Sequence, residues 1–600
     1  MSMNTDGLQL AKEIDVAMRR QEGTLVIKNL KIFNVFTQEV MEGDIAIEGE
    51  KIVGIGRYNG RENGSNVIDG EGKIAIPGLI DGHIHLESAM VHPREFARAV
   101  VRHGTTTVIT DPHEIANVAG EEGIKYMLDA TKDLPIKVFF MLPSCVPATP
   151  FDESGAVLNQ EELAPFYEDN RVLGLAELMN YVGTVAGDEI VLDKVVDARK
   201  RGKLVDGHAP ELSGDALNAY VCAGARSDHE CSSFQEARQK ISLGQWVMIR
   251  EGTAAKNLKA LLGLFDAPYN QRCMLATDDR HPGDLFREGH IDFIIKEAIA
   301  LGADVRTAII MATKNAATYF GLEGYGAIAP GYFADIVLLD DLEHFNVEMV
   351  INHGKPVYSI GSDQISDQIS DHRLDHRLNH RSEGVAKALE NRQQWKRVYN
   401  SVNIRPVAVE QLDCKIVDQK VRAIGLVAHE LYTKNLSILL SEDAVTSKEA
   451  FQREMDEKDL TYLSVVERHK ATGHIGNAYL SGYGLKRGAI ASSVAHDSHN
   501  IIVAGKQKED MVLAIECIAK MNGGLCITCD GEVLCELPLP IGGLMSEESV
   551  VVVDKKLSKL KEIAKNLGVY DTIDPFMTLA FVSLPVIPEL RLTSPGLVEV

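Results

Sequence analysis

The sequence predicts an α/β protein in which a (β/α)8 TIM-like barrel is inserted in a small β-sandwich and followed by a C-terminal α/β domain. Eight short apolar runs alternate with helix-like segments over about 250 residues, which is the size and repeat number of such a barrel. Short strands punctuated by Asn and Gly stand on either side of that region, at 24–56 and again at 326–358. An open doubly wound sheet would also fit the alternation, but eight repeats favour a closed barrel.

The chain of 600 residues is long enough for about two to four domains. The expected order is a first part of the β-sandwich, the barrel, the returning part of the β-sandwich, a low-complexity linker and the C-terminal domain, at 1–75, 76–324, 325–360, 361–388 and 389–600. The linker carries a four-residue repeat with His372, His376 and His380, which favours a linker or solvated helix over a metal-binding tract. In the C-terminal domain we expect strands at VRAIGLVA, GAIASSVA, NIIVAG and GLCITCD.

The charge balance excludes some partners. Lys and Arg number 62 against 86 Asp and Glu, a formal net charge of −24, which argues against nucleic acid and anionic membrane surfaces as partners. The N-terminus lacks the apolar segment of a signal peptide, and no window is apolar enough to span a membrane. Nine scattered cysteines indicate reduced thiols in the cytoplasm. The CxxC of Cys526 and Cys529, with Cys535 nearby, lacks the second pair that a zinc site usually needs.

Most of the eight apolar runs end in His, Asp or Glu. They read IPGLIDGHIH, TTTVITDPHE, IKVFFMLPSC, RVLGLAELMN, GKLVDGHAP, GARSDHE, QWVMIREGT and CMLATDDRHP. In a barrel, the carboxyl ends of the strands meet on one face, where the active site lies. Polar residues that are far apart in the sequence are therefore expected to meet in space.

These strand ends supply a candidate metal site. His83 and His85 form an HxH pair, and alternate residues of a strand point the same way. With the ends of later strands, the candidate ligands are His83, His85, Glu177, His208, His229 and Asp278. Six ligands are too many for one catalytic ion with an open position, but they suit two ions bridged by Glu177. The nitrogen and oxygen donors suit zinc, manganese or ferrous iron.

The motifs around these residues resemble the amidohydrolase superfamily and, within it, the bacterial adenine deaminases, over nearly the whole chain. The motifs are PGLIDGHIHLESAM, TDPHEIANVAG, GLAELMN, DGHAP, SDHE and ATDDRHP. Glu177 stands where many relatives in the superfamily carry a carboxylated lysine. This glutamate narrows the resemblance within the superfamily, and the motif DPHEIANV narrows it further. The stretch from Glu467 to Asn500 is similar to the domain appended in adenine deaminases.

The resemblance implies hydrolytic deamination of adenine to hypoxanthine and ammonia, as in purine salvage, with two Mn²⁺ or Fe²⁺ ions and Zn²⁺ also compatible. A metal-bridged hydroxide would attack C6 of the purine, and Asp278 would take its proton. Attack on an aromatic carbon also needs a second acid, for which the candidates are Asp111, His113 and Glu114. A helix start fixed by Pro112 is the alternative reading of that motif. We expect a small purine base as partner and a homo-oligomer, taken as a dimer.

Further residues are candidates for substrate binding, namely Glu87, Ser88, Asp279 and His281. Glu87 could instead cap the next helix, and Arg280 either orients a ligand or makes a surface salt bridge. In the last domain, His496, Asp497 and His499 form either a site or an exposed loop.

Two other functions stay open. One is a different binuclear amidohydrolase, acting on a cyclic amide or another amino-heterocycle. The other is a non-catalytic relative that serves in binding, although such a protein should have lost a metal ligand and all six are present.

Overall fold

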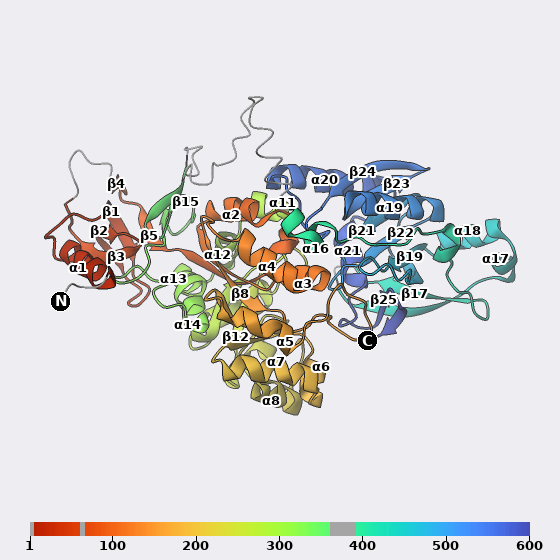
Figure 1. Cartoon of the computed structure of the whole chain (residues 1–600), viewed down its shortest axis with the longest axis horizontal. Helices are drawn as coiled ribbons and strands as arrows, with labels where there is room; N and C mark the ends of the chain where they lie inside the picture. Colours follow the sequence, from red (N-terminus) through yellow and green to blue (C-terminus); the bar gives the residue numbers. More distant parts are fainter. Residues whose placement is uncertain (1–4, 60–65, 361–391, 429) are drawn as a thin grey trace, which may run out of the picture.

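The computed structural model describes residues 5–59, 66–360, 392–428 and 430–600 (Figure 1). The linker predicted at 361–388 lies outside these residues. The predicted fold class is confirmed: an α/β chain folds as a TIM-like barrel with a β-rich C-terminal domain. In the described parts of the chain, no helix has the length and apolar character that a membrane crossing requires. All nine cysteines are free thiols, and Cys526 and Cys529 are buried.

One sheet at the N-terminal end of the molecule combines strands that precede the barrel in the sequence with strands that follow it (Figure 1). Its spatial order is β16 (Lys355–Ser359), β15 (Val347–Asn352), β14 (Ile336–Leu339), β5 (Ile74–Pro77), β1 (Leu25–Phe33), β2 (Val40–Glu48) and β3 (Lys51–Gly56), with β4 (Val67–Asp69) beside β1. Strand β5 joins the two parts because it pairs parallel with β1 and antiparallel with β14. Helix α1 (Thr5–Ala17) packs Val16 against this sheet.

The barrel strands correspond to the eight predicted runs. In the described residues they are β6 (Leu79–Ile84), β7 (Thr105–Thr110), β8 (Lys137–Leu142), β9 (Val172–Leu178), β10 (Leu204–Gly207), β11 (Ser227–Asp228), β12 (Trp246–Arg250) and β13 (Cys273–Ala276). Strands β6 to β10 form one parallel sheet and β11 to β13 another. Backbone hydrogen bonds cross both seams, from Arg226 N to Val205 O at 2.9 Å and from Asp278 N to His83 O at 2.9 Å. The curled sheets therefore close on each other.

Apolar side chains from the barrel strands fill the barrel interior, among them Ile80, Ile109, Met141, Met248 and Met274. The helices of this region are α2 (Pro93–Val101), α3 (His113–Ala119), α4 (Glu121–Ala130), α5 (Gln160–Leu163), α6 (Tyr181–Ala186), α7 (Glu189–Lys200), α8 (Gly214–Ala223), α9 (Phe234–Ser242), α10 (Leu258–Leu261), α11 (Pro282–Arg287), α12 (Ile291–Ala300), α13 (Val305–Ile310) and α14 (Ala316–Phe320). The interior is a packed core, so ligands can reach the barrel only at its ends.

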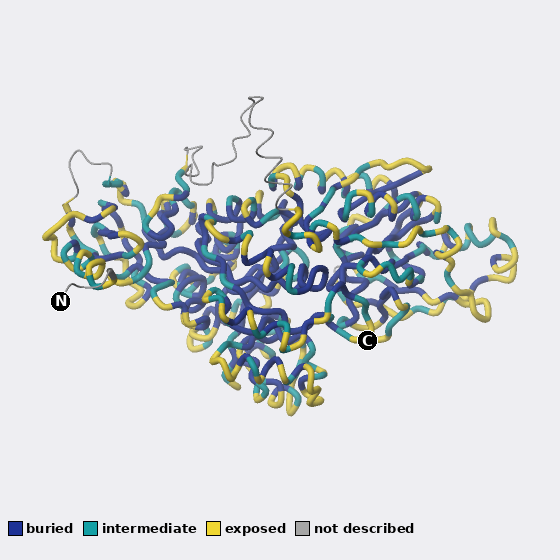
Figure 2. Tube along the Cα trace, viewed as in Figure 1, coloured by how far each residue is buried: buried dark blue, intermediate teal, exposed yellow. Residues whose placement is uncertain are grey.

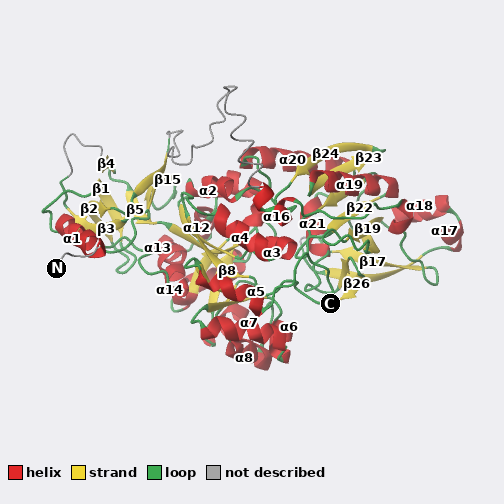
Figure 3. Cartoon of the chain, viewed as in Figure 1, coloured by secondary structure: helices red, strands yellow, loops and turns green. Residues whose placement is uncertain are grey.

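The C-terminal domain is built on a mixed sheet, shown in yellow in Figure 3. Its order is β18 (Thr433–Leu439), β17 (Lys420–Leu426), β20 (Ile475–Ser481), β19 (Leu460–Val466), β22 (Ile501–Gly505), β21 (Ala489–Ser492), β23 (Gly524–Cys529) and β24 (Glu532–Pro538), and β25 (Leu590–Thr593) pairs separately with β26 (Gly596–Glu599). The helices are α16 (Lys396–Tyr399), α17 (Glu442–Thr446), α18 (Lys448–Glu457), α19 (Lys508–Met521), α20 (Val550–Asn566) and α21 (Pro575–Val582). The predicted strands coincide with β17, β21, β22 and β23, but neighbouring strands mostly run antiparallel.

The C-terminal domain packs directly against the barrel, and the buried trace in Figure 2 continues from one to the other. Ser546 exchanges backbone hydrogen bonds of 2.9 Å with Met90 and His92, in the segment that follows β6. Arg287 at the end of α11 pairs with Asp554 in α20 at 2.6 Å. These contacts hold the C-terminal domain next to the end of the barrel where β6 stops.

Candidate active site

The six predicted ligands lie together at the carboxyl ends of the barrel strands. His83 belongs to β6, Glu177 to β9, and the others follow β6, β10, β11 and β13. His208 is partly exposed and the rest are buried. Residues that are up to about 200 positions apart in the sequence thus meet as predicted, because parallel barrel strands end on one face.

Glu177 occupies the centre of this cluster and divides it into two halves. Its Oε1 atom lies 3.7 Å from His83 Nε2 and 3.3 Å from His85 Nε2. Its Oε2 atom lies 2.7 Å from His208 Nδ1 and 3.2 Å from His229 Nε2. Asp278 joins the first half, with Oδ1 at 3.3 Å from His85 Nε2. Each carboxylate oxygen of Glu177 therefore faces its own pair of imidazoles.

The cluster has the donors and the unmet polar groups that a divalent cation would satisfy. Ligand atoms of His83, Glu177 and His229 lie within 4.8 Å of one another, as do those of His83, His85 and Asp278. His83 Nε2 is buried and has no hydrogen-bond partner among the described residues. Nitrogen and carboxylate donors without thiolate suit first-row divalent metals. The residues present therefore fit a divalent metal site.

In the protein chain itself, protonated imidazoles supply the positive charge next to the carboxylates of the cluster. Burial alone would raise the pKa of Glu177, but His229 and hydrogen bonds from the neighbouring imidazoles hold it well below the usual value. Burial likewise opposes a charge on His229, whereas Glu177 and Glu230 raise its pKa to about 10. Since ligand imidazoles must lose these protons to bind a metal, binding at this cluster is coupled to proton release.

Behind His83, a buried polar network fixes the end of β6. Asp81 Oδ1 accepts hydrogen bonds from the backbone N–H groups of His83 and Thr277, at 3.2 Å and 3.1 Å. Asp81 Oδ2 lies 3.0 Å from His290 Nε2, and Thr105 bonds the other ring nitrogen of His290 at 2.9 Å. This network connects β6 to the start of the loop after β13 and so sets the spacing between His83 and Asp278.

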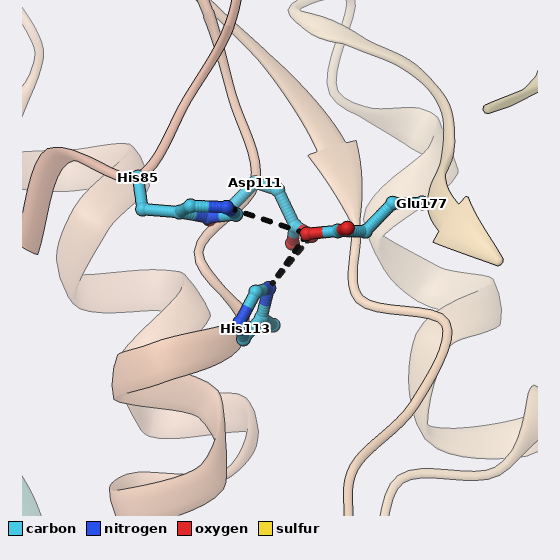
Figure 4. A group of neighbouring side chains, drawn as sticks. All are labelled: His85, Asp111, His113 and Glu177. Carbon is cyan, nitrogen blue, oxygen red and sulfur yellow. Dashed lines mark hydrogen bonds and ion pairs between the residues drawn. The ribbon is translucent and has the colours of Figure 1, made fainter. Parts of the chain in front are cut away.

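Two of the three candidate acids join the cluster (Figure 4). His113, the first residue of α3, places Nδ1 2.9 Å from Asp111 Oδ2 and 3.7 Å from Glu177 Oε1. The backbone oxygen of Asp111 contacts His85 Nδ1 at 3.0 Å. Pro112 does start the helix, as the alternative reading held, but the same turn aims Asp111 and His113 at Glu177.

The third candidate, Glu114, is held by the C-terminal domain. Its Oε1 atom lies 2.5 Å from His496 Nδ1, and its Oε2 contacts His499 Nε2. Both histidines and Asp497 are buried, so the exposed-loop reading of this motif is wrong. Burial would raise the pKa of Glu114, but His496 and His499 hold it well below the usual value. Glu114 is therefore an ionised carboxylate that ties the C-terminal domain to α3.

The tautomer of His499 argues against a third metal site at the contact between His499 and Glu114. Its Nδ1 accepts the backbone N–H of Ala495 at 3.1 Å, so in the neutral ring the proton is on Nε2. Burial lowers the pKa of His499 to about 4, which keeps the ring neutral. Nε2–H therefore donates to Glu114 and has no lone pair for a metal.

Replacing His499 with phenylalanine should weaken this tie while preserving the ring volume. A hydrogen bond to a charged group contributes about 1.5–3 kcal/mol, so we expect the free energy of unfolding of the metal-free protein to fall by about 2 kcal/mol. Urea unfolding followed by far-UV circular dichroism measures the change. His344→Phe is the matched control, because that imidazole is 67% exposed, and it should change the value by under about 0.5 kcal/mol. Equal stability of the two variants would contradict a stabilising role for His499.

The predicted substrate-binding residues lie beside the same cluster. Ser88 hydrogen-bonds Asp279, and Glu87 Oε1 accepts the N–H of Ile115 at 3.2 Å. Glu87 thus caps α3, whereas the alternative in the sequence analysis was that it caps the next helix. Burial raises the pKa of Glu87 to about 7. His281 Nδ1 is buried without a partner among the described residues, and burial lowers the pKa of His281 to about 4.

Arg280 does not make a simple surface salt bridge. It is buried, and it donates to the carbonyl oxygens of Glu251 and Gly289 at 2.7 Å and 3.0 Å. Its ion pair with Glu288, at 3.1 Å, reaches the surface only on the Glu288 side. Arg280 therefore braces the loop that follows β13 and carries Asp278.

Sequence reasoning missed two residues of the cluster, Glu230 and Arg250. Glu230 Oε1 lies 3.3 Å from His229 Nε2 and 3.5 Å from His208 Nδ1. Arg250, the last residue of β12, bonds both oxygens of Glu230 at 2.6 Å and 2.7 Å and also pairs with Asp278. Glu230 is the last residue of the run GARSDHE and Arg250 lies within the run QWVMIREGT, so the position near a strand end is the sequence signal for both.

Comparison with known proteins identifies the family. Residues 74–357 match the model of the amidohydrolase family, and residues 435–600 match the adenine deaminase C-terminal domain. The chain is 45% identical over 587 residues to adenine deaminase 2 of Carboxydothermus hydrogenoformans, covering 98% of this chain and 97% of that protein. It is 45% identical over 592 residues to the adenine deaminase of Clostridium acetobutylicum, with 98% of each chain covered. Among solved structures, a dihydropyrimidinase from Brevibacillus agri is 18% identical, covers 56% of this chain and 95% of its own, and has a TM-score of 0.45. Because the two relatives match at 45% identity over nearly the full length, the chain belongs to the adenine deaminase family of amidohydrolases.

Proposed function

We propose that this protein catalyses the hydrolytic deamination of adenine to hypoxanthine and ammonia, as in purine salvage. The names of its relatives indicate adenine as the substrate, and the position of Glu177 indicates the type of chemistry. Its two carboxylate oxygens face separate pairs of imidazoles, which is the observation that carries the proposal of a binuclear hydrolytic site.

We propose Mn²⁺ or Fe²⁺ as the two ions, with Zn²⁺ compatible with the same donors. One ion would be held by His83, His85 and Asp278, the other by His208 and His229, with Glu177 shared between them. When bound, such a pair supplies an activated water and a positive clamp for developing negative charge.

The protein side chains then handle the protons. We propose that Asp278 takes the proton of the attacking water, which its position at the cluster and its ion pair with Arg250 support. His113 is the acid that we favour for protonating the ring. Asp111 accepts a hydrogen bond from Nδ1–H of His113, so the imidazole can hold a second proton at Nε2. The Nε2 atom faces away from Asp111, toward the C-terminal domain. Ser88, Asp279, Glu87 and His281 remain the candidates for contacts with the base.

The test is direct. The protein is purified, loaded with Mn²⁺ or Fe²⁺, and mixed with adenine, and conversion to hypoxanthine is followed by ultraviolet absorbance. We expect turnover of adenine with at least one of the two metals and none with a cyclic amide such as dihydrouracil. Hydrolysis of the cyclic amide without any turnover of adenine would overturn the proposal.

A further inference from the structure

A loop of the C-terminal domain, 495–500, is fixed against the barrel by nearly all of its polar side chains. His496 and His499 contact Glu114, Ser498 contacts Asp152, and Asn500 Nδ2 donates to the carbonyl oxygen of Glu153 at 2.8 Å. The loop therefore bonds to the segments that follow β7 and β8, on the face where the metal cluster lies. These contacts hold the loop in place against the barrel.

Asp497 is the exception within this loop. Its side chain is 4% exposed, and its Oδ2 atom is buried with no hydrogen-bond partner among the described residues. Its Oδ1 atom lies 3.9 Å from His113 Nε2, which is too long for a hydrogen bond. Leaving a buried acceptor without a donor costs about 1–3 kcal/mol, so such a group in a rigid loop indicates a missing donor.

The position of Asp497 tells which part of a substrate could supply that donor. Asp497 lies close to the metal cluster, since its Oδ1 is 3.9 Å from Nε2 of His113 and Nδ1 of the same ring is 3.7 Å from Glu177 Oε1. A purine whose C6 lies at the cluster directs its five-membered ring to the opposite end. In free adenine that ring carries an N–H group, and in a base substituted at N9 it carries none.

We propose that Asp497 is a specificity-determining residue whose carboxylate accepts the N–H of the purine five-membered ring and so selects the free base over N9-substituted bases. This inference rests on the proposed function and assigns the C-terminal domain a direct part in substrate recognition. A site built to pair a substrate N–H discriminates strongly against an analogue that lacks it, because the buried acceptor is then left unpaired.

The experiment compares hypoxanthine with 9-methylhypoxanthine, and adenine with 9-methyladenine, on the Mn²⁺-loaded protein. Dissociation constants come from calorimetry and kcat/KM from absorbance. The wild type should prefer the unmethylated compound by at least about 10-fold, the ratio expected of a hydrogen bond to a charged group. In Asp497→Ala this preference should shrink to less than about threefold, mainly through weaker binding of the unmethylated compound. Asp497→Asn keeps an acceptor oxygen and should lie between the two.

Ser498→Ala is the control, because it alters the same loop at a side chain whose hydrogen bond is to Asp152. It should keep the wild-type preference, and metal content measured by mass spectrometry should be the same in all variants. The inference is overturned if Asp497→Ala keeps the wild-type ratio, or if it weakens methylated and unmethylated ligands equally, which would place the contact at another edge of the base. If Asp497→Ala does not fold, the isosteric Asp497→Asn decides by the same ratio. Failure of the proposed function is distinct, since the wild type itself would not convert adenine.

Discussion

Glu177→Ala should lose bound metal and deaminase activity together. The carboxylate faces His83 and His85 through one oxygen and His208 and His229 through the other, so removing it breaks both halves of the cluster. We expect the Mn²⁺ content after loading to fall from about two ions per chain to below one. Because metal catalysis supplies several kcal/mol, kcat/KM for adenine should fall about a thousandfold or more.

The measurement pairs mass-spectrometric metal analysis with the adenine assay on the same samples. Glu168→Ala is the matched control, since this glutamate precedes the same strand and its side chain is 84% exposed. It should retain both ions and kcat/KM within about twofold of the wild type. If Glu177→Ala retained two ions, Glu177 would not be the bridge, whatever happened to the activity.

The metal cluster could be predicted from the sequence because its signal is local. Each proposed ligand ends or follows a short strand, and a parallel barrel brings all strand ends to one face, so counting runs was enough. This held even for His229, whose strand β11 is only Ser227–Asp228. Arg250 was not among the predicted site residues, and the carboxylates of Glu230 and Asp278 explain its position.

The contribution of the C-terminal domain could not be predicted in the same way. Glu114 contacts His496 and His499 across 382 and 385 residues of sequence. Contacts between domains leave no periodicity in either segment, so His496 and His499 looked equally compatible with an exposed loop. Burial decides between the two readings, and burial depends on how two separately folded sheets pack. The mixed, mostly antiparallel order of the second sheet was hidden for a related reason, since apolar runs predict strands but not their partners.

Arg250→Met should destabilise the metal-free protein more than an ordinary core substitution. The guanidinium bonds both oxygens of Glu230 and one oxygen of Asp278, and its side chain is 10% exposed. Methionine fills similar space but removes the guanidinium that pairs with both buried carboxylates. Breaking a buried ion pair by removing one partner costs about 3–5 kcal/mol, and we expect a loss of free energy of unfolding in this range.

Urea unfolding can be followed in the barrel itself. The chain has two tryptophans, and Trp246 lies in β12, the strand that ends at Arg250, so a Trp395→Phe background makes Trp246 fluorescence report on this region. Arg238→Met, at an exposed position of α9, is the control and should change stability by under about 0.5 kcal/mol. Adding Glu230→Gln to Arg250→Met removes one of the two stranded charges and should restore part of the loss. Loading with Mn²⁺ should restore more, because the cations would neutralise the same carboxylates. A metal-free Arg250→Met protein as stable as the Arg238→Met control would show that Glu230 and Asp278 do not need this counter-charge.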